Sequence, residues 1–125
     1  MKVEWNTGLV THLGIEFVEV TPDRVVARLK VSDKLMTVGG TVHGGTLMAF
    51  ADTIGAAGTV VNLAAGQSTA TLESKTNFFA ACRSGVLRAE ATPLHKGKRT
   101  HVWQTRITDE AGKLLSLTTQ TQMIL

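Results

Sequence analysis

The chain has 125 residues, a length that suits one domain and leaves little room for a second. Its 43% hydrophobic and 18% charged residues exclude a disordered chain, and a net charge of +3 is too small to predict nucleic-acid binding unless the charges cluster. One cysteine excludes an internal disulfide, and without a signal peptide or a membrane-length apolar run we expect a single cytoplasmic domain, residues 1–125.

The first half of the chain predicts a short helix, two strands and one long helix. Residues 4–13 carry apolar side chains at helical spacing, and a glycine follows them. Strands are expected over 15–20 and 24–31, because a Thr-Pro-Asp turn lies between them. After a loop over 35–45, the segment 46–63 is apolar on almost every side, which is typical of a buried helix.

The second half predicts four strands in a meander. Apolar and polar residues alternate there, and Thr, Val, Ile and Leu are frequent. Segments 95–99 and 109–113 contain glycine and read as hairpin turns. The four strands are expected over 67–79, 86–92, 100–108 and 114–123.

These elements predict an α+β fold, with an antiparallel sheet of about six strands wrapped around one long central helix and a short N-terminal helix. Such a sheet leaves part of the helix and one sheet edge open. A second copy related by a two-fold axis would bury both. We therefore expect a homodimer, or a homotetramer built as a dimer of dimers.

The long helix is preceded by a glycine-rich segment that points to chemistry. The first N–H groups of a helix lack internal partners and carry partial positive charge, so they attract an anion or a developing oxyanion. Glycine lets a ligand carbonyl approach them, which makes His43-Gly44-Gly45 a candidate oxyanion site. The alternative is that the glycines only form tight turns.

Asp52 lies two helical turns beyond Gly45, on nearly the same face and among apolar or small neighbours. A carboxylate there is costly unless it has a partner or a task, although a structural hydrogen bond would also explain it. Gly44 and Asp52 are roughly 12 Å apart along one helix, too far to reach the same small carbonyl. Two antiparallel copies could bring Gly44 of one chain to Asp52 of the other.

The stretch 43–52, HGGTLMAFAD, resembles the hotdog-fold acyl-CoA thioesterases, most closely the phenylacetate-pathway (PaaI-type, 4HBT-like) branch. It matches the His-Gly-Gly helix opening and the Phe-Ala-Asp carboxylate of that branch. The resemblance implies a hotdog domain over nearly the whole chain and hydrolysis of the thioester of a small or medium acyl-CoA, aromatic ones included. It implies no metal and no separate cofactor, since coenzyme A arrives with the substrate, and no nucleic-acid or membrane partner.

Carried over by position, the resemblance assigns roles around the thioester carbonyl. The Gly44 N–H would polarise the carbonyl, and His43 would lie beside it. Gly45 belongs to the same His-Gly-Gly start of the helix. Asp52 of the partner chain would act as general base on water or as nucleophile. Thr71 would help to position the water.

The resemblance also assigns roles to residues outside the stretch 43–52. Asn6, in the first helix, would lie near the reacting centre. Apart from the resemblance, we expect the size of the acyl pocket to depend on residues from two chains, namely Phe50, Ile54, Phe78, Phe79 and the first helix. The candidates for binding the phosphates and adenosine of coenzyme A are Lys96, Lys98, Arg99 and Arg83.

The sequence departs from the family pattern at Thr37, where relatives often carry Asn or Gln, and at Ala56, where some branches have Ser or Thr.

Two other functions are alternatives to thioester hydrolysis. A non-catalytic module that binds acyl-CoA or acyl carrier protein would have no need of Asp52. A hotdog dehydratase would use a histidine base in a different loop pattern, which the flanking glycines of His43 argue against.

Overall fold

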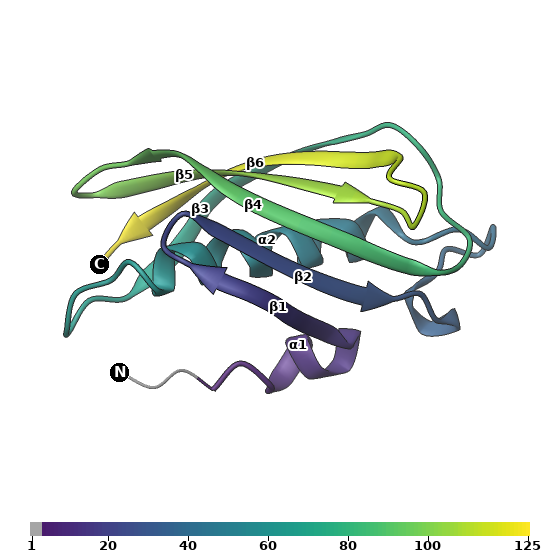
Figure 1. Ribbon diagram of the computed structural model, residues 1–125, viewed down its shortest axis with the longest axis horizontal. Coiled ribbons are helices and arrows are strands. Elements are labelled where there is room, and N and C mark those ends of the chain that lie inside the picture. The colour runs from purple at the N-terminus through teal and green to yellow at the C-terminus, as the bar shows by residue number, and fades with distance from the viewer. Residues whose placement is uncertain (1–3) are drawn as a thin grey trace.

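The computed structural model describes residues 4–125 and shows a six-stranded antiparallel sheet curved around one long helix, with a short helix beside the first strand (Figure 1). This confirms the predicted α+β fold. In chain order the elements are α1 (Gly8–Leu13), β1 (Ile15–Thr21), β2 (Arg24–Lys30), the 3₁₀ turn η1 (Asp33–Leu35), α2 (Gly44–Val60), β3 (Thr69–Phe78), β4 (Val86–Lys96), β5 (Thr100–Thr108) and β6 (Leu114–Ile124).

The helices differ from the prediction at their ends. α1 begins at Gly8 rather than at residue 4, so the segment before it is not helical. α2 begins at Gly44, two residues earlier than expected, because the His43 side chain caps it by accepting the Gly45 N–H at 2.7 Å. η1 ends at Leu35, where the predicted loop begins, and a bridge between Met36 and Val42 lies within that loop.

The strand order corrects the predicted four-strand meander. The sheet runs β1-β2-β4-β5-β6-β3, so only β4, β5 and β6 form a meander. β3 pairs with β6 at one edge, although β4 follows it in sequence. The connection after β3 instead passes beside the start of α2, where the Val42 N–H donates to the Cys82 carbonyl at 2.8 Å, and delivers β4 to β2.

The core lies between the inner face of the sheet and α2. Two glycines make room in this helix for bulky side chains from the sheet. A methyl group on Gly58 would lie 2.5 Å from Cη2 of the fully buried Trp103, and one on Gly55 would overlap the amide of Gln120. The largest apolar side chains that are fully buried are Trp103, Phe50, Leu29, Ile54, Leu87, Ile107 and Leu115.

One side of α2 is left partly open, as expected for a sheet that covers a helix from one side. This open stripe consists of Gly45, Met48, Ala49, Asp52, Thr53, Ala56 and Val60, none of which is fully buried. The stripe is the part of the helix that the predicted sheet was expected to leave open. β3 lies at a sheet edge and exposes Leu72 by 54%. Within residues 4–125 no helix is both long and apolar enough to cross a bilayer.

Candidate active site

The N-terminus of α2 presents one unused backbone donor. Nδ1 of His43 accepts the Gly45 N–H at 2.7 Å, and the His43 carbonyl accepts the Thr46 N–H at 2.9 Å. The Gly44 N–H meets no acceptor within residues 4–125. Of the two glycine amides in the predicted motif, only that of Gly44 is available to a ligand. Because Nδ1 of His43 accepts a hydrogen bond, a neutral ring carries its proton on Nε2.

A pocket of about 390 Å³ opens at this end of the helix, with Gly44, Leu47, Phe78 and Phe79 in its wall. A methyl group on Gly44 would lie 3.2 Å from Cζ of Phe78, so glycine keeps the space beside the amide open. Phe78 and Phe79 are about half exposed, which suits an apolar ligand.

Two residues expected in the acyl pocket are elsewhere. Phe50 and Ile54 are fully buried between α2 and the sheet, because they lie on the helix face opposite the open stripe. The expectation that they line the pocket is wrong for the surface of this chain.

Asp52 lies midway along the open stripe, and its carboxylate is held at one oxygen only. Oδ1 accepts the Thr71 hydroxyl at 2.7 Å and the Gln120 amide Nε2 at 2.9 Å. Oδ2 receives no hydrogen bond from residues 4–125. Thr71 accepts in turn from Nε2 of Gln122 at 2.6 Å, so the support of the carboxylate extends to β3 and β6.

Gln120 and Gln122 were not identified from the sequence. They belong to a row of fully buried polar side chains on the inner face of β6: Ser116, Thr118, Gln120 and Gln122. The signal was present, since polar residues recur at every second position there. Sequence alone could not show that this face turns inward toward a carboxylate on α2.

The structure brings Thr71 to Asp52, whereas Asn6 is separate from them. Thr71 gives its single hydroxyl hydrogen to Asp52, so it orients the carboxylate directly. Asn6 lies in an exposed bend before α1, and its placement in the first helix is wrong. It lines a shallow pocket with Trp5 and Phe17, and its side chain forms no hydrogen bond within the described chain.

The four predicted coenzyme A cations lie in two groups near opposite ends of α2. Nη1 of Arg83 lies 3.4 Å from the Gly40 carbonyl, just before the helix begins. Nζ of Lys96 contacts Asp23 at 2.6 Å and Asn62 at 3.3 Å, just beyond the helix end, so its charge is already paired. Lys98 and Arg99, on the same hairpin, form no ion pair within residues 4–125.

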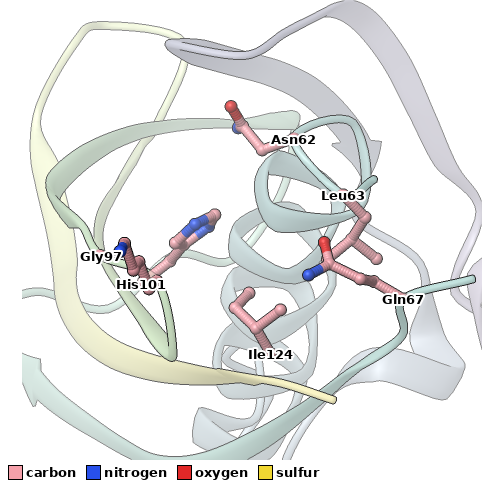
Figure 2. A pocket seen from close by; sticks show the side chains of 7 residues that line it. Asn62, Leu63, Gln67, Gly97, His101 and Ile124 are labelled. Carbon is pink, nitrogen blue, oxygen red and sulfur yellow. The ribbon is translucent and has the colours of Figure 1, made fainter. Parts of the chain in front are cut away.

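A second pocket of about 400 Å³ lies between that hairpin and the end of α2, with Lys98, Gln67 and His101 in its wall (Figure 2). The His101 ring points toward α2, where its Nδ1 lies 3.1 Å from the Thr59 hydroxyl. Burial lowers the pKa of His101, and the positive charges of Lys96 and His95 lower it further.

Comparison with known proteins agrees with this arrangement. The model of the thioesterase superfamily matches residues 39–116. A 1,4-dihydroxy-2-naphthoyl-CoA hydrolase of Listeria monocytogenes is 34% identical over 110 residues, which are 88% of this chain and 89% of the relative. The proofreading thioesterase EntH of Cronobacter turicensis is 31% identical over 105 residues, 84% of this chain and 77% of the relative.

The fold agrees as well. The crystal structure of a thioesterase from Haemophilus influenzae superposes with a TM-score of 0.89 at 33% identity, covering 94% of this chain and 82% of that one. The family match spans the start of α2, the carboxylate of Asp52 and the strand that carries Thr71. The chain therefore belongs to the thioesterase superfamily, as a thioester hydrolase with the hotdog fold.

Proposed function

We propose that this chain hydrolyses small or medium acyl-CoA thioesters, aromatic ones included, at active sites shared between two antiparallel copies. The observation that carries the proposal is the presence of two unused groups on α2, one at its N-terminus and one on the open stripe. These are the Gly44 N–H and the Oδ2 atom of Asp52, neither of which has a partner within residues 4–125.

The spacing of these groups is the reason for invoking two copies. Roughly 12 Å of helix separates Gly44 from Asp52, so one chain alone cannot bring both to one thioester. Antiparallel pairing along the open stripe would place each Gly44 near the partner chain's Asp52. It would also bring Arg83, near the start of one helix, toward the basic hairpin at the end of the other.

The chemistry follows from the two groups. The Gly44 N–H would stabilise the negative charge that develops on the carbonyl oxygen, by about 3 kcal/mol for one well-placed donor. Oδ2 of Asp52 would take a proton as the water oxygen bonds to the carbonyl carbon. The intermediate then expels the coenzyme A thiolate as the carbon–sulfur bond breaks, and the proton passes to sulfur. Direct attack by Oδ2 on the carbonyl carbon would instead break the carbon–sulfur bond, expel the thiolate and form a mixed anhydride, which water hydrolyses to the free acid and the Asp52 carboxylate.

The pocket beside Gly44 supports an aromatic or similarly compact acyl group, because Phe78 and Phe79 present half-exposed rings to it. The relative from Listeria monocytogenes is named a 1,4-dihydroxy-2-naphthoyl-CoA hydrolase, and the naphthoyl group in that name is a bicyclic aromatic acyl group. Lys98 and Arg99 would contact the coenzyme A phosphates. This substrate class fits a cytoplasmic enzyme that works as a homodimer or a dimer of dimers.

The test is a thiol-release screen with aromatic, short, medium and long acyl-CoAs. Asp52→Asn should lower turnover on the order of 100-fold or more and keep the fold, because the new amide oxygen can still accept from Thr71 and Gln120. Thiol release in Asp52→Asn at the wild-type rate, or no release by the wild type from any acyl-CoA, would contradict the proposal.

A mixing experiment tests the shared site. Gly44→Val should be inactive alone, because its side chain would block the amide. Refolded together with Asp52→Asn, it should recover about a quarter of wild-type activity, since half of the dimers would carry one intact site. No recovery would show that each site is built from a single chain.

A further inference from the structure

We propose that Gln120 is a positioning residue for the reaction: with Thr71 it holds Oδ1 of Asp52, which leaves Oδ2 as the oxygen that reacts. The proposal rests on the role of Asp52 proposed above, and it holds whether Oδ2 takes a proton or attacks the carbonyl.

The contacts fix the carboxylate from two strands. Nε2 of Gln120 lies 2.9 Å from Oδ1 and 3.3 Å from the backbone carbonyl of the same aspartate. The Thr71 hydroxyl approaches Oδ1 at 2.7 Å from β3. Two donors on the same oxygen resist rotation of the carboxylate, because rotation would break both bonds.

The amide of Gln120 is held in this orientation at a cost. Gln120 is fully buried, and its Oε1 has no hydrogen-bond partner among the described residues. A buried oxygen without a donor is unfavourable, and such groups in native proteins call for an explanation. Turning the amide over would aim Oε1 at the carboxylate and repel it. The unpaired oxygen is thus the consequence of directing N–H to Asp52.

Gly55 provides the space for this amide. A methyl group at position 55 would overlap Oε1 and the amide carbon of Gln120. Glycine inside a helix is less favourable than alanine, so this position also sacrifices helix stability. Gln120 and Gly55 therefore both lower the stability of the fold while they support one hydrogen bond to Asp52.

A purely structural explanation accounts poorly for this residue. Thr118, in the same buried row, bonds the Thr76 hydroxyl of β3 at 2.8 Å and needs nothing from α2. An apolar side chain at position 120 would fill the same volume without an unpaired oxygen. What distinguishes Gln120 is that the only hydrogen bonds of its side chain within residues 4–125 go to Asp52.

The variants that test the proposal are Gln120→Leu, which removes the donor at similar volume, and Gly55→Ala, which displaces the amide without removing it. Gln104→Leu is the matched control, because Gln104 lies on the neighbouring strand with its side chain on the other face of the sheet. Gln120→Leu and Gly55→Ala should lower kcat about tenfold or more with KM unchanged.

A second readout does not depend on turnover. In ¹³C-labelled protein, with Asp52→Asn for assignment, the chemical shift of the Asp52 carboxyl carbon should differ between Gln120→Leu and the wild type, because this shift responds to the hydrogen bonds that Oδ1 accepts. The comparison tests the hydrogen bond even if the wild type cleaves no thioester, an outcome that would overturn the proposed function alone.

Gln120→Leu with the wild-type kcat would overturn the proposal, as would an unchanged chemical shift of the Asp52 carboxyl carbon. Equal losses of kcat in Gln120→Leu and Gln104→Leu would also overturn it. If Gln120→Leu does not fold, Gly55→Ala decides, because a folded variant with the wild-type kcat refutes the positioning role.

Discussion

Gly58→Ala should destabilise the protein, although alanine is the better helix former. The added methyl group would lie 2.5 to 2.8 Å from three atoms at the outer edge of the Trp103 ring. That ring is fully buried and is tied to α2 by a hydrogen bond of 2.9 Å from Nε1 to the Thr59 hydroxyl, so it cannot slide away without losing the bond.

The expected magnitude follows from three contributions. Overpacking a core costs about 1–3 kcal/mol, and weakening the Trp103–Thr59 hydrogen bond costs about 1 kcal/mol. The higher helix propensity of alanine compared with glycine offsets about 1 kcal/mol of this loss. The free energy of unfolding should fall by about 2 kcal/mol, which for a chain of this length lowers Tm by roughly 8 °C.

The assay is thermal and urea denaturation at one fixed protomer concentration, because association would otherwise shift the midpoint. Trp103→Phe serves as the matched background, since phenylalanine lacks the outer ring atoms that meet the methyl group. In that background Gly58→Ala should be neutral or stabilising. A Tm for Gly58→Ala at or above the wild-type value, or the same loss in both backgrounds, would refute the packing argument.

Two further results are expected. Replacing Lys98 and Arg99 together by glutamate should raise KM for acyl-CoA about tenfold and leave KM for an acyl-N-acetylcysteamine thioester unchanged. Lys113→Glu, on the other hairpin, is the control. An equal effect on both substrates would show that these cations do not bind coenzyme A. Folding lowers the pKa of His101 from its ordinary value of 6.5. As the pH drops, His101 is therefore protonated in the unfolded chain before it is protonated in the folded chain. The free energy of unfolding should fall below about pH 6.5. Tm measured from pH 7.5 to 5 should show this decline, and a His101→Gln variant with the same slope would exclude His101 as its source.

The sequence contained enough information for the strands and for the core of the site. Period-two alternation locates β5 with its observed ends, and the start of α2 is off by only two residues. The placement of β3 could not be predicted in the same way. A strand joined by a loop of several residues can pair with its neighbour in sequence or leave it, and here the connection beside α2 carries β4 away to β2.

The site was predictable where its residues lie together in the motif and not where partners come from far along the chain. Gly44 and Asp52 share one helix. Gln120 reaches Asp52 from 68 residues away, and Lys96 pairs with Asp23 across 73. Such contacts depend on which face of a strand turns inward, and an alternating Thr-Gln segment fits either face.

The position of β3 at the sheet edge has a consequence for the order in which the protein folds. Within residues 4–125 its sole sheet partner is β6, and the register joins Thr69 to Ile124, so β3 has no strand to pair with during synthesis until the last strand has been made. The local hairpins of β4, β5 and β6 close over much shorter loops and should form first. Thr71 should therefore take its place beside Asp52 only after the last strand has been made, so the carboxylate gains this donor late in folding.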